Sequence, residues 1–275
     1  MTCISLAAMP LYTNLDRIAR GLAAAGVGPN DPVAPEQLFA LDQWHYHGTD
    51  AIRAAAEWLG LGRRSRVLDI GGGIGGPARY LAHVTGCHVT AVEIQPELHA
   101  IGVDLTRRSG LGDRVTHICG DALTCPLDDA SFDAVVSWLA ILHIPDRRRL
   151  CTRLARAVRA GGGCYIEDLC MHAPFVADDL KSVREIVCGI SMSSIEDYVK
   201  DLQSAGFIDV AATDLTGDWA PFAAVRLRKW RQDHEAYARV HGEQAYAAQE
   251  TFYAVIAHLY ESGSLGGVRL TARVP

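Results

Sequence analysis

Residues 67–82 read VLDIGGGIGGPARYLA, and five of the six positions from 71 to 76 are glycine. The stretch begins with an apolar run and ends in residues with helical spacing, so it predicts a strand, a tight turn and a helix. Glycine in such a turn lets the backbone approach a neighbour that side chains would keep away. The turn therefore predicts either close packing of the helix on the strand or a ligand held against the backbone.

The same alternation of strand and helix extends outward from this turn. Short apolar runs predict buried strands at residues 67–70, 89–93, 115–119, 134–137 and 164–168. Helical spacing separates most of them, most clearly at residues 77–84, 97–109 and 147–159. This pattern implies crossover connections and a mainly parallel sheet. The glycines of RAGGG, residues 159–163, predict the end of the last of these helices.

The pattern changes after residue 168. It predicts a helix at 194–205, a strand at 207–215, a long and mostly helical region at 219–262, and a final strand in the tail GGVRLTARVP. No internal repeat and no linker between independent domains is present in the sequence. We therefore expect one α/β domain with helical additions at both ends.

Composition excludes several classes of protein. The chain has 275 residues, of which 49% are hydrophobic and 21% charged, as in ordinary globular domains. A formal net charge of −6 and the lack of a basic block argue against binding to nucleic-acid phosphate. No apolar stretch reaches the about 18 residues of a membrane span. Residues 1–14 lack the form of a secretory signal, although Arg17 and Arg20 leave open an amphipathic targeting helix as well as a helix of the fold.

None of the eight cysteines forms a C-x-x-C pair, and several lie in apolar runs. This spacing favours buried thiols in a reducing compartment over disulfides or zinc ligands. We therefore expect a cytoplasmic protein with no nucleic-acid partner, no membrane partner and no metal.

Three carboxylates near the ends of predicted strands indicate what the glycine turn binds. Residues 71–76 match G-x-G-x-x-G, which alone is a weak signal for a dinucleotide. Asp69, two residues before the first glycine, would repel a pyrophosphate at the helix N-terminus and suits a cationic ligand. Glu93 ends the second strand, where it could accept hydrogen bonds from a ribose diol. Asp121, in CGDALTCP, follows the third strand, where it could accept from an adenine amino group.

An acid before G-x-G-x-G, then an acid, then Asp-Ala, resembles the class I S-adenosylmethionine-dependent methyltransferases over residues 60–215. The resemblance implies a Rossmann-like α/β fold: a seven-stranded, mostly parallel sheet with an antiparallel last strand, helices on both faces and helical decorations over the pocket. It implies S-adenosyl-L-methionine as the cofactor. The cofactor-binding residues that it implies are Asp69, Gly71, Gly72, Gly73, Gly75, Glu93, Ile94, Gln95, Asp121, Ala122, Ser137 and Trp138.

The resemblance also implies how the chain is divided. We expect a single methyltransferase domain with a helical cap at 1–59, a cofactor-binding core at 60–170, substrate-side helices and a strand at 171–262, and the final strand at 263–275. Its partner would be a small-molecule methyl acceptor, and the protein would be a monomer or a homodimer.

Histidines are the candidate catalytic residues. Methyl transfer from a sulfonium is an in-line displacement that depends on alignment, and an oxygen or carbon acceptor usually also needs a base. His45 and His47 lie in DQWHYHGT, and His143 lies in LAILHIPD. His143 follows the fourth predicted strand, at the sheet edge where open α/β folds bind ligands. We predict catalytic roles for His143 and His47, with a packed turn and a loop histidine as the structural alternatives.

The C-terminal region resembles the group that contains sarcosine/dimethylglycine and phosphoethanolamine N-methyltransferases, through residues 191–219 and 259–275. This favours N-methylation of a small amine. The alternatives are O- or C-methylation of a natural product, a cofactor-binding protein without activity and, more distantly, an NAD-dependent oxidoreductase. An arginine would suit a carboxylate or phosphate, and aromatic rings would suit an ammonium. The predicted substrate-binding residues are Trp44, Tyr46, Asp168 and Arg226.

Overall fold

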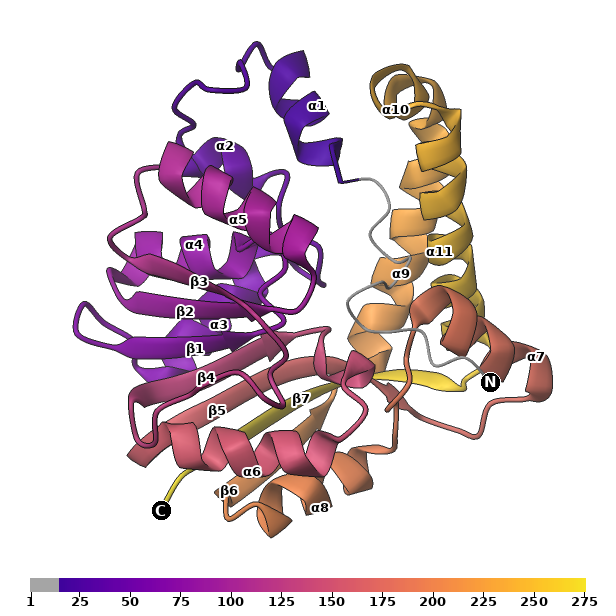
Figure 1. Ribbon diagram of the computed structural model, residues 1–275. Coiled ribbons are helices and arrows are strands. Elements are labelled where there is room, and N and C mark those ends of the chain that lie inside the picture. Colours follow the sequence, from indigo (N-terminus) through magenta and orange to yellow (C-terminus); the bar gives the residue numbers. More distant parts are fainter. Residues whose placement is uncertain (1–14) are drawn as a thin grey trace.

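The computed structural model describes residues 15–275, and seven strands form a single sheet at its centre (Figure 1). The order across the sheet is β3-β2-β1-β4-β5-β7-β6. The strands are β1 (Arg66–Ile70), β2 (His88–Glu93), β3 (Val115–Cys119), β4 (Phe132–Trp138), β5 (Val158–Met171), β6 (Ile208–Asp214) and β7 (Leu265–Arg273). Strands β1 to β5 pair in parallel, and β7 is antiparallel to both β5 and β6. The predicted Rossmann-like sheet with an antiparallel last strand is confirmed.

Helices cover both faces of this sheet. One apolar cluster packs α6 (Arg147–Ala157) and α8 (Ile195–Ser204) on one face, and another packs α3 (Thr49–Leu59) and α4 (Gly76–Thr85) on the other. α5 (Pro96–Arg108) packs against β3 and β2. The buried strands carry near-continuous apolar runs because a parallel sheet is covered on both sides.

One helix boundary differs from the prediction. α6 ends at Ala157 and β5 begins at Val158, so the glycines at 161–163 lie inside the strand instead of ending the helix. The register between β4 and β5 shifts between Phe132 and Ala134. A Cβ atom on Gly162 would lie 2.6 Å from the Asp133 carbonyl oxygen, so this close approach of the two strands requires glycine.

Helices of the C-terminal region, within residues 216–261, stand together beside the sheet (Figure 1). α9 (Thr216–Gln232) packs along α11 (Glu243–Glu261), with α10 (His234–His241) between them in the chain. α1 (Arg17–Ala24) reaches α10, where the Arg20 guanidinium donates to the His241 carbonyl oxygen at 2.6 Å. The shorter helices are α2 (Pro35–Phe39) and α7 (Ala177–Ser182), and a π-helical turn at Val183–Val187 continues α7.

The N-terminal prediction is answered in part. Arg17 and Arg20 lie on α1, which is a helix of the fold, whereas the predicted form of residues 1–14 and the thiol of Cys3 fall outside the described residues. Across residues 15–275, every helix is too short or too polar to cross a bilayer.

Candidate active site

A cavity of about 780 Å³ lies where the strands β1, β2, β3 and β4 end. One wall is the glycine turn and the segments that follow these strands, and the other is formed by α9 and α11. Thirteen of the predicted site residues line it: Trp44, Tyr46, Gly71, Gly72, Gly73, Glu93, Ile94, Gln95, Asp121, Ala122, Trp138, His143 and Arg226. Five do not line it: His47, Asp69, Gly75, Ser137 and Asp168.

Gly73 is the glycine that leaves room for a ligand. Its φ of 52° lies in the left-handed region, and a Cβ atom added to it would meet no other atom within 4 Å. Its amide donates to Glu93 Oε2 at 2.9 Å, which ties the turn to the end of β2. Since Gly73 lines the cavity, a side chain here would occupy space that the turn keeps open.

The other glycines of the turn serve packing. A Cβ atom on Gly75 would lie 2.5 Å from the His117 ring, and one on Gly76 would lie 2.2 Å from the Asp42 carbonyl oxygen. Gly75 faces the protein interior, which corrects the expectation that it contacts a cofactor. Gly76 lets residues 40–48, which we call the strap, cross directly over the start of α4.

Asp69 lies buried behind the turn, with only 1% of its surface exposed. Its Oδ2 atom has no hydrogen-bond partner among the residues described. Burial and the nearby Glu93 carboxylate raise the pKa of Asp69 to about 7. Asp69 therefore lies outside the cavity lining, and its carboxylate, when ionised, favours positive charge on the other side of the turn.

Glu93 and Asp121 hold the two segments that follow β2 and β3. Glu93 Oε1 accepts from the Gln95 amide at 2.8 Å, and Asp121 Oδ1 accepts from the Leu123 amide at 2.8 Å. Burial raises the pKa of Glu93. Both residues line the cavity, so acceptor oxygens and an open glycine turn face the same space. These features fit a sulfonium nucleoside, which carries a ribose diol, an adenine amino group and a positive charge.

The end of β4 contributes one residue to the cavity and one to the sheet. Trp138 lines the cavity, and its Nε1 atom is buried without a hydrogen-bond partner in the described part of the chain. Ser137, in contrast, is 1% exposed, and its hydroxyl donates to the Ile70 carbonyl oxygen at 2.9 Å. Ser137 links β4 to β1 and does not face a cofactor, contrary to the prediction.

His143 lies on a 3₁₀ turn, Ile141–His143, that follows β4 and borders the cavity. Its Nδ1 atom lies 2.9 Å from the Cys188 carbonyl oxygen. Because a carbonyl can only accept, Nδ1 carries the proton and Nε2 keeps its lone pair. Burial lowers the pKa of His143. The imidazole is therefore neutral at physiological pH and has one nitrogen free to accept a proton.

Asp168 holds the loop that carries His143. Its side chain is fully buried, Oδ2 accepts from the Leu142 amide at 2.8 Å and from the Tyr198 hydroxyl at 3.1 Å, and Oδ1 accepts from the Leu169 amide at 2.9 Å. Burial raises the pKa of Asp168 to about 7. The structure therefore makes Asp168 a positioning residue, which corrects its prediction as a substrate ligand.

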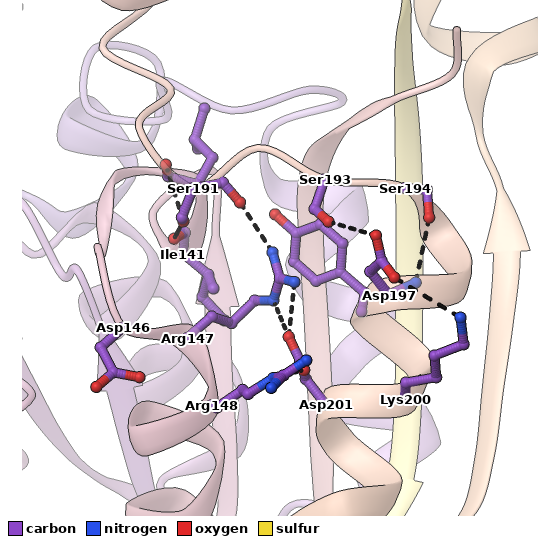
Figure 2. Close-up of polar contacts among 12 residues, drawn as sticks. Ile141, Asp146, Arg147, Arg148, Ser191, Ser193, Ser194, Asp197, Lys200 and Asp201 are labelled. Carbon is purple, nitrogen blue, oxygen red and sulfur yellow. Dashed lines mark hydrogen bonds and ion pairs between the residues drawn. The ribbon is translucent and has the colours of Figure 1, made fainter. Parts of the chain in front are cut away.

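A second network fixes the same loop from the outside (Figure 2). The Arg147 guanidinium joins Asp201 Oδ2 at 2.6 Å and the Ser191 carbonyl oxygen at 2.8 Å. The Ser191 hydroxyl donates to the Ile141 carbonyl oxygen at 3.0 Å. The Ser191 amide donates to the Leu142 carbonyl oxygen, also at 3.0 Å. The segment that supplies the Cys188 carbonyl is thus bonded to the turn that carries His143.

The two histidines of the strap lie on opposite sides of it. His45 is 5% exposed and lines the cavity, and its Nε2 atom lies 2.9 Å from the Gly48 carbonyl oxygen. Burial lowers the pKa of His45 to about 4. His47 instead is exposed and pairs with Asp218 Oδ2 at 2.8 Å, outside the cavity. The structure brings His45 into the site in place of the predicted His47. The chain turns at His47, whose φ is 56°, so the two histidines do not share a face as residues i and i+2 of an extended segment would.

A buried ion pair anchors the strap to the core. Asp42 Oδ2 lies 2.8 Å from the Arg79 guanidinium, and both side chains are 0% exposed. Arg79 is on α4, directly after the glycine turn. The strap is therefore fixed to the helix that begins at the turn.

Arg226 and the aromatic residues around it form the opposite wall. The Arg226 guanidinium donates to the His45 carbonyl oxygen at 3.0 Å and lies 5.2 Å from the Tyr46 ring. Tyr46 stacks on Trp219 with ring centroids 4.1 Å apart. Trp44 also lines the cavity, and its indole donates to the Leu41 carbonyl oxygen at 3.2 Å. Arg228, also on α9, is exposed and outside the cavity.

Sequence reasoning missed the residues that α11 contributes to this wall. Phe252, Tyr253 and Ile256 all line the cavity. The helical spacing of the region was visible, but apolar residues occur all round it, so no periodic signal showed which face meets the cavity.

Comparison with known proteins identifies the family. A family model described as a methyltransferase domain matches residues 67–162. 27-O-Demethylrifamycin SV methyltransferase of Amycolatopsis mediterranei is 32% identical over 226 residues, which cover 80% of this chain and 81% of that protein. Sarcosine/dimethylglycine N-methyltransferase of Halorhodospira halochloris is 30% identical over 205 residues, which cover 70% of this chain and 72% of that protein. Matches to three other curated methyltransferases span only 60%, 46% and 44% of their lengths.

The fold has solved counterparts. Phosphoethanolamine N-methyltransferase 2 of Haemonchus contortus, in complex with phosphomonomethylethanolamine and S-adenosylhomocysteine, superposes with a TM-score of 0.82 at 22% identity. The superposition covers 99% of this chain and 61% of that one. The glycine turn with its carboxylates, the fold and the two relatives matched over more than two thirds of their length agree: the chain belongs to the class I S-adenosylmethionine-dependent methyltransferases.

Proposed function

We propose that this protein transfers a methyl group from S-adenosylmethionine to the nitrogen of a small-molecule amine. The observation that carries the proposal is one continuous cavity. It joins the open turn at Gly73 and the acceptor oxygens of Glu93 and Asp121 to two neutral imidazoles, those of His45 and His143.

The wall at the strand ends would hold the cofactor, which supplies an electrophilic methyl group on sulfur. Glu93 would accept from the ribose hydroxyls, and Asp121 with the Ala122 amide would bind the adenine edge. Ile94 and Gln95 would flank the base. Asp69 acts through the turn: its buried carboxyl favours a positive charge in front of the glycines over a neutral one.

The acceptor would lie between the loop of His143 and the opposite wall. An amine attacks through its lone pair, so it must arrive without its extra proton. His143 Nε2 is free to accept an N–H hydrogen bond, which orients the lone pair away from the imidazole. The Tyr46 and Trp138 rings would stabilise the methylammonium that forms, by about 0.5–2 kcal/mol. Arg226 would pair with an acid group of the acceptor.

O-Methylation is the second candidate, because the same His143 nitrogen could take the proton of a hydroxyl. The relatives include both chemistries: one is named as an N-methyltransferase of sarcosine and dimethylglycine, and another as a methyltransferase of 27-O-demethylrifamycin SV. A modest preference for nitrogen comes from the aromatic rings and from Arg226.

The test is a mass-spectrometric screen of amines and hydroxyl compounds with labelled S-adenosylmethionine. A product labelled on nitrogen supports the proposal. Labelling on oxygen or carbon alone replaces it with the second candidate or with C-methylation. Failure to consume the donor with any acceptor would favour a binding protein without activity.

The organisation and location of the protein follow as further proposals. We propose that residues 60–170 form the cofactor-binding core and 171–262 the substrate side of one domain, which acts as a monomer or homodimer. A cytoplasmic location is supported by the seven cysteines within residues 15–275, which are free thiols. The negative net charge of −6 supports a partner other than nucleic acid.

A further inference from the structure

The acceptor wall of the cavity is far longer than a small amino acid. Cavity-lining residues recur on one face of α11, at Ala245, Ala248, Gln249, Phe252, Tyr253 and Ile256. The eleven residue steps from the first of these to the last cover about 16 Å of α-helix. α9 lines the same space with Ala223, Arg226 and Trp230, again at helical spacing.

The two ends of this wall have different surroundings. Ile256 packs in the same buried cluster as Leu142, the residue before His143, so this end lies at the catalytic loop. The other end lies at α10: Tyr246, next to Ala245, has its ring 5.7 Å from that of Trp230 and 6.4 Å from that of Tyr237. A two- or three-carbon amine at His143 would leave the α10 end without contact.

The side chains between these ends are mostly apolar or aromatic. Trp230 and Tyr237 lie with ring centroids 4.0 Å apart, and both line the cavity. Ala245 and Ala248 leave space where larger residues would fill it. Arg226 and Gln249 are the polar groups along the two helices, and Arg226 lies 5.7 Å from the Tyr253 ring. Such a surface binds apolar groups and is poorly matched to a free zwitterion.

We infer that the methyl acceptor carries an apolar arm, aliphatic or aromatic, that extends from His143 along α11 toward α10. Ala248, near the middle of the wall, is then a specificity-determining residue because its small side chain makes room for the arm. The inference rests on the proposed function, since that function places the reacting nitrogen at the His143 end.

Calorimetry on the protein saturated with S-adenosylhomocysteine tests the inference without turnover. The probes are sarcosine and a series of ω-phenylalkylamines with one to six methylenes. The dissociation constant should fall along the series by up to about fourfold for each methylene buried. Sarcosine binding as tightly as the longest amine would overturn the inference.

A pair of variants on α11 locates the arm. Ala248→Trp should fill the space beside α11 and weaken the binding of the longest amine at least tenfold. Benzylamine and S-adenosylhomocysteine should bind as they do to the parent. Ala247→Trp is the matched control, because Ala247 is exposed on the same helix outside the cavity. Equal effects of the two variants on the longest amine, or no effect of Ala248→Trp, would contradict the placement. Long amines that bind but receive no methyl group would instead refute N-methylation and leave the arm in place.

Discussion

Replacing Asp69 with asparagine should alter how stability depends on pH. The Asp69 carboxyl is buried with an unpaired Oδ2 atom, and its pKa is raised to about 7, whereas that of an unfolded aspartate is about 3.9. Between these two values the unfolded chain has released the proton and the folded protein still holds it. Stability therefore falls as the pH rises through this window, and the loss is complete once the pH exceeds about 7.

The size of the effect follows from the same pKa. From pH 5 to pH 7 the loss is about 1.4 kcal/mol for each pH unit, or about 3 kcal/mol in all. Asparagine carries no charge, so Asp69→Asn should lack this loss and gain about 3 kcal/mol on the parent between pH 5 and pH 8. Urea unfolding of the ligand-free protein at pH 5, 6, 7 and 8 measures it.

A control and a ligand measurement complete this test. Asp128→Asn removes an exposed carboxyl, so its stability should run parallel to that of the parent. In the parent, the affinity ratio of cationic S-adenosylmethionine to neutral S-adenosylhomocysteine should rise from pH 5 to pH 8, and in Asp69→Asn it should stay flat. If parent and Asp69→Asn unfold with parallel pH profiles, the buried ionisation argued here does not occur.

Three further substitutions test the cavity lining at the strand ends, and a fourth serves as a control. Gly73→Val should weaken the binding of S-adenosylhomocysteine more than tenfold, as measured by calorimetry, while circular dichroism shows a folded protein. Unchanged affinity would mean that the turn does not contact the cofactor. Asp121→Ala should cost about 1–3 kcal/mol of cofactor affinity, and no loss would remove Asp121 from the site. His143→Ala should lower kcat at least tenfold across the pH range with cofactor affinity kept, whereas His47→Ala should match the parent; the reverse order would exchange their roles.

Much of the fold was predictable because its signals are local. The apolar runs placed β1, β2 and β3 within a residue of their observed bounds, since buried parallel strands have few polar positions. The glycines of residues 159–163 led to a wrong prediction of the helix end, because glycine is favoured both where a helix ends and where two strands approach closely. The two cases are separated only by the neighbouring strand β4, whose backbone lies so close to Gly162 that no side chain would fit there.

The lining of the cavity at the strand ends was likewise predictable, because it is built from short segments that directly follow strands. The failures share one cause. Ser137 and Asp168 lie at the ends of the predicted strands, as a ligand-binding residue would, yet β5 continues to Met171. Their bonds go to the Ile70 carbonyl and to the loop of His143. Whether a polar side chain serves a ligand or the backbone depends on partners far away in the chain. For the same reason, sequence did not separate His45 from His47.

The two walls of the cavity come from separate stretches of the chain. The segments that follow β1 to β4 lie within residues 67–162, the region that the methyltransferase model matches, and α9 and α11 lie wholly outside it. The turn and strand-end segments that would hold the cofactor are thus separate in the chain from the two helices of the opposite wall, while His143 lies within the matched region. Exchanging residues 216–261 for the matching helices of another family member should therefore change which compounds fit the cavity, while the glycine turn and its carboxylates stay in place.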